Sequence, residues 1–330
     1  MNVILFDSNR SNFYPLSYTR PISEFRIGIL TIKEKWTHYY KNISTKTEDY
    51  LVSKYPIRKQ KENLWIDASV LPSKELKTEL DSLRNGEVLE SNGKIIAFKN
   101  VNYSFKNLNK INTSILVDSI ENIWDIFSDN GREIEADFKL LTKARKSQKI
   151  SNTNTVIGKH IFVEKGAKIS CSILNAENGP IYIGKNAEIM EGSMIRGPFA
   201  LCDHATVKMS AKIYGATTIG PHTKVGGEIN NCVIFGYSNK GNLVSRYNLV
   251  GNYKSVDNIV ENILTNFSSY ETKSDQKQAT CTVGLFLQRH KMQRTNRLRR
   301  RHEIEVLYQT CKITFYKYAG FLKYIYLYGC

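Results

Sequence analysis

Branched aliphatic side chains recur at every sixth position through the middle of the chain, and this period is the strongest constraint on its fold. The main run comprises Ile183, Ile189, Ile195, Leu201, Val207, Ile213, Ile219 and Val225. A shorter run, out of phase because of an insertion at 175–180, comprises Ile157, Val163 and Ile169. Small side chains stand two positions before most of these aliphatics: Ala187, Ser193, Ala205, Ala211, Thr217 and Thr223.

A period of six matches a triangular coil built from three short parallel strands. Each side of such a coil points one residue at the axis, so that residue must be apolar, and small residues fit the tight corners. Stacked coils form a solenoid in which each coil buries its faces only against its neighbours. The sequence therefore predicts a left-handed parallel β-helix of hexapeptide repeats over residues 155–237.

The segment before residue 150 predicts a separate domain of α/β type. Strand-like apolar runs stand at 1–7, 50–55, 63–70 and 93–100, and the first ends at Asp7, as the opening strand of a parallel sheet does. Residues 119–146 predict two helices with a break at 130–131, and Ile123, Trp124 and Ile126 form an apolar docking face. We therefore expect domains at 1–150 and 151–241, joined by a polar segment, and a separate basic segment at 242–330.

Composition narrows the class of protein. At 330 residues and 41% apolar content, the chain suits two ordinary domains. Its longest apolar runs stop short of the roughly 18 residues of a membrane span, and its start lacks the features of an export signal. The six cysteines are scattered without a CxxC pair, which is typical of reduced thiols and predicts a cytoplasmic location.

The formal net charge of +16 raises the question of nucleic acid. Much of the excess lies in a cluster at 290–302, and the remainder is spread thinly, as suits a protein that handles phosphorylated small molecules. We therefore expect neither nucleic acid nor a membrane as the principal partner.

The whole span 1–241 resembles the bacterial bifunctional sugar nucleotidyltransferase/acetyltransferases, which are relatives of the N-acetylglucosamine-1-phosphate uridyltransferase family. Five segments carry the resemblance: LFDSNRSNFYPLSYTRPISEFRIGILTIKEKW (5–36), WDIFSDNGREIEADF (124–138), NTNTVIG (152–158), NGPIYIGKNAEIMEGSMIRGPFAL (178–201) and KIYGATTIGPHTKVGGEINNCVIFGYSNKG (212–241). It implies an α/β domain that couples a sugar 1-phosphate to a nucleoside triphosphate and releases pyrophosphate. It also implies a β-helix that forms a homotrimer and, in the bifunctional relatives, transfers an acetyl group from acetyl-CoA.

Nucleotidyl transfer needs cations for the triphosphate and carboxylates for Mg²⁺. The familiar G-x-G-T-R loop is absent, because residues 7–21 contain no glycine. The candidate phosphate-binding cations are Arg10, Arg20, Arg26 and Lys35. An alternative interpretation treats them as surface or sheet-edge charges. The candidate magnesium ligands are Asp7 and Asp67. Nothing in the spacing selects a nucleobase, but the resemblance, together with the basic segment at 7–35, implies a UDP- or dTDP-sugar as the product.

The acetyltransferase half departs further from the family. The resemblance places its general base, a histidine, where SNKGN has Asn242, and an amide cannot take the proton. His160, His204 and His222 stand in or near coil corners and are interpreted as surface residues. We therefore expect no acetyl transfer from acetyl-CoA by this chain.

The hexad ceases after Val225, and the family-like sequence ends at Gly241. Residues 242–330 are open to three interpretations: a capping domain for the exposed coil end, a basic and aromatic segment that binds nucleic acid or a membrane surface, or a frameshifted translation of an ordinary β-helix terminus. The abrupt change of composition favours the last, and lost coils predict a weakened trimer. Two functions compete with catalysis: a non-catalytic hexapeptide scaffold and nucleic-acid binding through 290–302.

Overall fold

The computed structural model describes residues 1–105 and 107–239, together with the backbone of 245–246 and 249–250. The expectations for Asn242 and for 251–330 lie outside the described residues. One compact unit comprises 1–13 and 19–251, and it contains both the α/β domain and the β-helix. Residues Tyr14–Tyr18 belong to a second unit, and the last three of them form the 3-10 helix η2 (Leu16–Tyr18).

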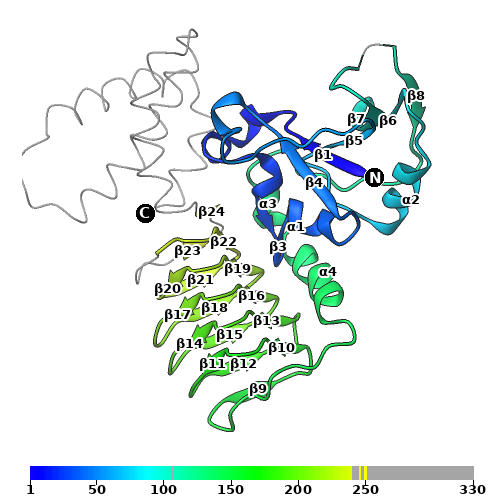
Figure 1. Cartoon of the computed structure of the whole chain (residues 1–330). Helices are drawn as coiled ribbons and strands as arrows, with labels where there is room; N and C mark the ends of the chain where they lie inside the picture. The colour runs from blue at the N-terminus through cyan, green and yellow to red at the C-terminus, as the bar shows by residue number, and fades with distance from the viewer. Residues whose placement is uncertain (106, 240–244, 247–248, 251–330) are drawn as a thin grey trace, which may run out of the picture. The chain divides into compact units, whose positions relative to one another are not determined.

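A six-stranded sheet with the order β4-β1-β5-β7-β6-β8 forms the centre of the α/β domain (Figure 1). Its strands are β1 (Asn2–Phe6), β4 (Asn42–Lys46), β5 (Asn63–Asp67), β6 (Glu87–Ser91), β7 (Lys94–Asn100) and β8 (Asn109–Asn112). Strand β1 pairs in parallel with β4 and β5, whereas β7 is antiparallel to β5 and β6. All residues of β1 and β5 are buried, as in central strands covered on both faces.

The predicted strands at 1–7, 63–70 and 93–100 are confirmed as β1, β5 and β7. The predicted strand at 50–55 is wrong, because this segment begins with the 3-10 helix η4 (Asp49–Leu51) and the edge strand is β4. Strand β4 buries the hydroxyls of Ser44 and Thr45, and the Thr45 hydroxyl lies 3.1 Å from that of Ser23. A strand that buries hydroxyl groups shows no apolar alternation, so periodicity cannot reveal it.

Short elements surround the sheet. They are η1 (Arg10–Phe13), η3 (Ile22–Glu24), β2 (Arg26–Ile27), β3 (Leu30–Thr31), α1 (Ile32–Thr37), α2 (Lys74–Ser82), α3 (Asp125–Ser128) and α4 (Asn130–Thr142). The two predicted helices are present, but the predicted break at 130–131 is wrong by one to two residues: α3 and α4 are separated at Asp129, and Asn130 and Gly131 begin α4. Ile126 is fully buried, but Trp124 is 47% exposed, so the prediction that Trp124 belongs to the docking face is wrong.

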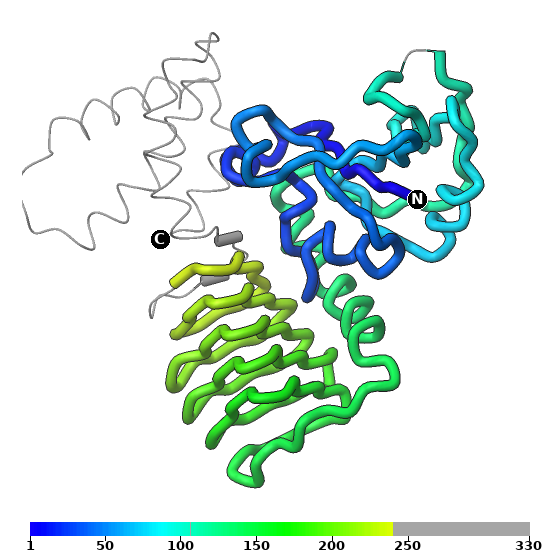
Figure 2. The backbone as a smooth tube through the Cα atoms, in the orientation of Figure 1, coloured from blue at the N-terminus to red at the C-terminus, as the bar shows by residue number. Residues whose placement is uncertain are grey.

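Three parallel sheets run from β9 to β24. Together they build the three-sided coil whose stacked turns Figure 2 shows. The first sheet contains β10 (Ile161–Val163), β13 (Ile181–Ile183), β16 (Phe199–Leu201), β19 (Thr217–Ile219), β22 (Val233–Ile234) and β24 (Leu249–Val250). The second contains β11 (Lys168–Ile169), β14 (Glu188–Ile189), β17 (Thr206–Val207) and β20 (Lys224–Val225). The third contains β9 (Thr155–Ile157), β12 (Ile173–Asn175), β15 (Met194–Arg196), β18 (Lys212–Tyr214), β21 (Glu228–Asn230) and β23 (Ser245–Arg246).

The aliphatic residues of the six-residue period line the axis of this coil. All eight aliphatics of the main run are at most 2% exposed, and the six small residues that precede them are fully buried. The expectation for Ile157 is wrong: it is 37% exposed, and Val156 stands in register with the buried Leu174. The insertion at 175–180 explains the phase change, because it lengthens the coil between Leu174 and its partner Ile195.

The coil continues past Val225, where the sequence pattern ends. Strands β21 and β22 extend two of the sheets, and Ile229 and Ile234 are buried in the same core. Ile213 pairs with Ile229, sixteen residues later, whereas Ile195 pairs with Ile213, eighteen residues later. A shortened coil therefore breaks the period of six without ending the fold.

A buried polar junction joins the β2–β3 hairpin to α4 and to the β-helix. The backbone nitrogen of Gly28 donates to the Asn130 side chain at 2.8 Å, and its carbonyl accepts from the Thr218 hydroxyl at 3.0 Å. Asn130 in turn donates to the Ala216 carbonyl at 3.0 Å. Three segments far apart in sequence thus share one set of hydrogen bonds.

Candidate functional site

The carboxyl ends of β1 and β5 form the edge of the central sheet where a ligand site is expected. Along the chain, β1 is followed by β4 on one side and then by β5 on the other, so the strand order reverses at β1. Ligands of open α/β sheets bind outside the carboxyl ends of the strands at such a reversal. Asp7 directly follows β1 and Asp67 ends β5, so both predicted magnesium ligands lie at this edge. Burial of Tyr103 and, next, the charges of Asp67 and Asp7 raise its pKa, which places the tyrosine near both carboxylates.

Asp7 anchors the loop that lacks glycine. Its Oδ2 accepts from the Arg10 guanidinium and the Thr47 hydroxyl, both at 2.6 Å, and its Oδ1 accepts from the Ile22 nitrogen at 2.9 Å. Burial raises the pKa of Asp7 and outweighs the lowering by these donors. Side-chain hydrogen bonds therefore hold this loop, where a glycine-rich loop would rely on its backbone.

Arg10 is the predicted cation that the structure places at this edge. Its side chain is 8% exposed, and besides Asp7 it contacts the Tyr50 hydroxyl at 3.2 Å and Glu48 at 3.8 Å. A second cation, Lys46 at the end of β4, lies 4.2 Å from the centroid of the Tyr103 ring. The rim of the edge therefore carries positive charge beside the two carboxylates.

Asp67 has a different environment from Asp7. It is 1% exposed; its Oδ2 accepts from the Ser8 hydroxyl at 2.7 Å and its Oδ1 from the Ser69 nitrogen at 2.9 Å. The Lys94 ammonium lies 4.0 Å from Oδ2. Asp67 thus keeps lone pairs for a further cation.

Lys94 and Glu121 complete this edge, and the sequence reasoning missed both. Lys94 begins β7, which runs antiparallel to β5, so its side chain reaches the end of β5. Its ammonium lies 2.5 Å from the Glu121 carboxylate and donates to the hydroxyls of Ser69 at 3.1 Å and Ser119 at 3.5 Å. One signal could have found Lys94: the Asn-Gly pair at 92–93 is typical of a tight hairpin turn, so it predicts that Lys94 opens a strand.

The other three predicted cations make their contacts at the junction of the domains. The Arg20 guanidinium lies 5.2 Å from the ring centroid of Phe235, a β-helix residue. Arg26 donates to the carbonyl of Ile29 and to Glu34, the latter at 3.2 Å. The Lys35 ammonium, 3% exposed, lies 2.5 Å from Asp137 and 2.9 Å from Glu133. These contacts tie elements of the fold together, so the function proposed below does not use them.

The donor set at this edge suits magnesium in part. Among the described residues, no three His, Cys, Asp or Glu side chains converge on one metal position. Mg²⁺ commonly takes only one or two protein carboxylates and completes its shell with water and phosphate. Asp67 and Glu121 fit this pattern, because both already converge on one cation, the Lys94 ammonium. Asp7 fits less well, because its oxygens already accept three hydrogen bonds.

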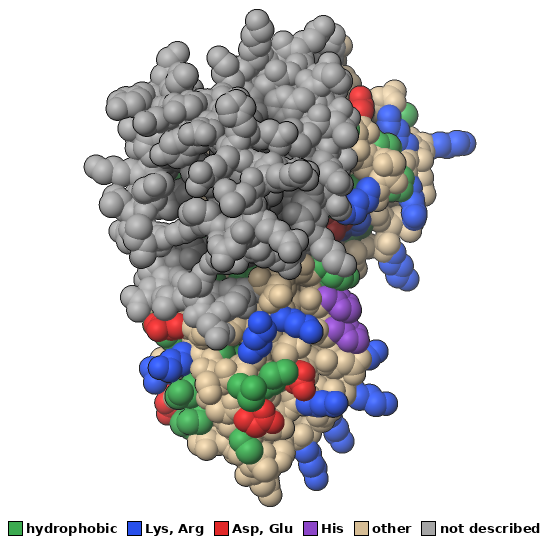
Figure 3. Space-filling view, turned by 90° about the vertical axis from the view of Figure 1, so that its left-hand side faces the viewer, with side chains coloured by type: hydrophobic (Ala, Val, Ile, Leu, Met, Phe, Trp, Pro, Cys, Tyr) green, Lys and Arg blue, Asp and Glu red, His purple; other side chains and the backbone are tan. Residues whose placement is uncertain are grey.

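The histidines of the coil corners lie on the surface, as predicted. His160, His204 and His222 are all exposed. The rings of His204 and His222 stack with centroids 4.8 Å apart, and Tyr237 extends the stack at 4.9 Å. Histidine side chains gather at one edge of the β-helix in Figure 3. This regular ladder follows from equivalent positions in successive coils.

The protein thus combines an α/β domain, whose sheet reverses its strand order at β1, with a parallel β-helix. Comparison with protein families matches residues 3–146 to the family described as sugar nucleotidyl transferase. The match covers the central sheet and α4, and it supports the nucleotidyltransferase part of the resemblance seen in the sequence. It supports a transferase of the nucleotidyltransferase kind for this domain. The comparison with curated proteins found no match. No helix in the described part of the chain is long and apolar enough to cross a membrane.

Proposed function

We propose that the edge formed by β1, β5 and β7 transfers a nucleotidyl group from a nucleoside triphosphate to a sugar 1-phosphate. One observation carries the proposal: Asp67 and Glu121 converge on Lys94 at the edge that also holds Arg10, where the strand order reverses in a domain that matches the sugar nucleotidyltransferase model. An oxygen of the sugar phosphate attacks the α-phosphorus, the bond to the β-phosphate bridging oxygen breaks, and the electron pair leaves with pyrophosphate. The protein contributes positioning and charge stabilisation.

Five residues of the edge have a role in this reaction. Arg10 and Lys94 neutralise phosphate charge. Asp7 is a positioning residue, because it holds Arg10 and the loop around it. Asp67 and Glu121 would hold Mg²⁺, which supplies charge neutralisation at the reacting phosphates. We expect the product to be a UDP- or dTDP-sugar.

The test is pyrophosphate release from a panel of sugar 1-phosphates and the four nucleoside triphosphates with magnesium. We expect Asp67→Asn to lower the rate by about a hundredfold or more, the size typical for loss of a group that stabilises transition-state charge. Asp118→Asn is the control, because Asp118 is an exposed carboxylate paired with Arg132. No release by folded protein across the panel would favour the non-catalytic scaffold. Salt-sensitive retention on DNA that disappears when 290–302 is deleted would favour nucleic-acid binding.

We further propose that the β-helix forms the homotrimer through its third sheet. Helix α4 already covers the first sheet, where Ile134 packs with Phe162 and Tyr182. On the third sheet, Ile173 and Met194 are paired neighbours that are 41% and 43% exposed. Figure 3 shows apolar side chains gathering on the coil stack. Apolar residues exposed side by side are typical of an interface.

Light scattering tests this assembly. The wild-type chain should show a mass near three protomers, and Met194→Glu should shift it toward the monomer, because the new charge would be buried at the interface. Met209→Glu, at a residue 66% exposed outside the strands, is the control and should leave the mass unchanged. A tight dimer of the wild type would contradict the proposal.

A further inference from the structure

Lys94 has an unusual set of neighbours for a lysine near the surface. Its ammonium is surrounded by oxygen atoms from four side chains: the carboxylates of Asp67 and Glu121 and the hydroxyls of Ser69 and Ser119. Its side chain is 26% exposed, so water can reach it and it can leave. An all-oxygen shell that contains two carboxylates is also the kind of shell that a hard divalent cation takes.

A lysine ammonium and a divalent cation cannot share this position. Two positive charges a few ångströms apart repel strongly near a protein surface. A metal that binds Asp67 and Glu121 must therefore displace the ammonium of Lys94. The flexible four-carbon stem lets the ammonium move as a compact point charge, and the nearest new partners are the phosphates that accompany the metal.

We propose that the Lys94 ammonium occupies the divalent-metal position in the metal-free protein and moves onto the phosphates when a metal–triphosphate complex arrives. This inference rests on the proposed nucleotidyl transfer at the same edge. Lys94 keeps Asp67 and Glu121 paired between turnovers, so the two carboxylates do not repel each other. It also couples the two ligands: the metal releases the lysine, and the lysine then binds phosphate.

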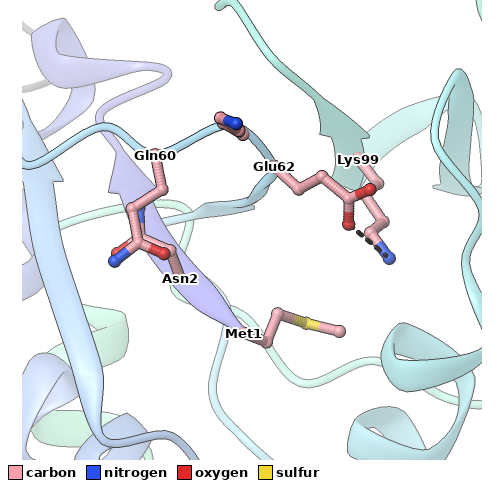
Figure 4. A pocket seen from close by; sticks show the side chains of 6 residues that line it. Met1, Asn2, Gln60, Glu62 and Lys99 are labelled. Atoms are coloured by element: carbon pink, nitrogen blue, oxygen red, sulfur yellow. Dashed lines mark ion pairs between the residues drawn. The ribbon is translucent and has the colours of Figure 1, made fainter.

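Strand β7 supplies a matched control at its other end. Lys99 lies on the same strand, and its ammonium is 3.8 Å from the carboxylate of Glu62. It borders an open hollow of about 740 Å³ that Met1, Asn2 and Gln60 also line (Figure 4). This hollow lies at the amino end of β1 and β5, so Lys99 is a lysine of the same strand that pairs with a single carboxylate away from the carboxylate edge.

The experiment measures two affinities by calorimetry on the full chain, one for Mg²⁺ alone and one for inorganic pyrophosphate in the presence of Mg²⁺. Lys94→Gln removes the competing charge but keeps a hydrogen-bond donor for the serines. It should bind Mg²⁺ roughly tenfold more tightly and pyrophosphate roughly tenfold more weakly than the wild type, the scale set by one charged contact. Lys94→Arg keeps the charge and should retain weak metal binding. Lys99→Gln should change neither affinity.

The outcomes separate the two proposals. Unchanged or weaker Mg²⁺ binding by Lys94→Gln, with the wild type binding both ligands, would overturn the role of Lys94 and leave nucleotidyl transfer standing. A wild type that binds neither Mg²⁺ nor pyrophosphate would overturn the proposed function itself. If Lys94→Gln does not fold, tight metal binding by Lys94→Arg would still count against the competition.

Discussion

Asp137, on α4, is the best place to test how α4 is held to the β2–β3 hairpin and to α1. It is 2% exposed, and its carboxylate accepts from the backbone nitrogens of Ile29 at 2.8 Å and Leu30 at 3.0 Å and from the Lys35 ammonium at 2.5 Å. Burial raises the pKa of Asp137 more than Lys35 lowers it, so the surroundings penalise the charged form. The perturbation we consider is Asp137→Ala.

The cost of this change follows from the groups that it leaves behind. Lys35, 3% exposed, would retain only Glu133 at 2.9 Å, and two backbone N–H groups would lose their acceptor. Removing one member of a buried ion pair typically costs about 3–5 kcal/mol. With a melting-temperature shift of roughly 2–4 °C per kcal/mol for a structure of this size, we expect a drop of at least about 6 °C.

The assay is urea and thermal unfolding of four proteins beside the wild type. They are Asp137→Ala, Lys35→Met, the double variant Lys35→Met/Asp137→Ala, and the control Asp118→Ala. The double variant should lose less than the sum of the two single changes, because neither buried charge then lacks its partner. Asp118 pairs with Arg132 at 3.0 Å with both side chains about half exposed, and an exposed pair contributes at most about 1 kcal/mol.

Two results would refute this reasoning. The first is an Asp137→Ala variant no less stable than Asp118→Ala. The second is a double variant whose loss equals the sum of its single changes, because additivity means that the two residues do not interact.

Three further predictions test other parts of the structure. Gly28→Ala should lower the free energy of unfolding by about 2–5 kcal/mol, because a Cβ there would lie 2.5 Å from Asp137 Oδ2. Gly86→Ala, at a similarly positive φ with open space around it, should cost only about 1–2 kcal/mol, so equal losses in urea would contradict the packing argument. Burial raises the pKa of Asp7 above its ordinary value of 3.8, so the stability that this carboxyl contributes is complete below pH 3.8 and is lost as the pH rises through the folded-state pKa. The advantage of the wild type over Asp7→Asn should therefore grow as the pH is lowered from 7, and an advantage that shrinks would overturn this assignment. The chain should transfer no acetyl group, since Asn242 stands where the base is expected and loss of a general base costs about a hundred- to ten-thousandfold in rate. Asn242→His alone should restore nothing, and release of thiol from acetyl-CoA that depends on glucosamine 1-phosphate would show that another residue supplies the base.

The α/β domain was only partly predictable from the sequence. Strands β1 and β5 were predictable because their interior residues form continuous apolar runs, which are typical of strands buried on both faces. Strand β4 does not, because Ser44 and Thr45 satisfy its buried positions through hydrogen bonds. The shortened coil at Ile229 likewise hides a β-helix turn that the backbone still pairs in parallel. Periodicity therefore fails where polar burial or a change in coil length replaces the regular pattern.

In the candidate site, too, the positions of some residues were predictable from the sequence and those of others were not. The placement of Asp7 and Asp67 at one edge was predictable, because each stands at the end of an apolar strand and parallel strands bring their carboxyl ends together. Arg26 and Lys35 were equally plausible cations in the sequence. The structure places both in buried contacts with Glu34 and Asp137, because the hairpin and α1 face α4 rather than the sheet edge.

The sequence by itself determined the β-helix, because the same local pattern repeats every six residues along the coils. Each repeat supplies one aliphatic residue for the axis and one small residue for the corner. It also determined the two central strands and the domain order. Only the tertiary structure decided which charges meet. Asp67, Lys94 and Glu121 come from three separate segments, and the antiparallel pairing of β7 with β5 brings them within reach of one cation. That pairing depends on the register between distant strands, which no local pattern encodes.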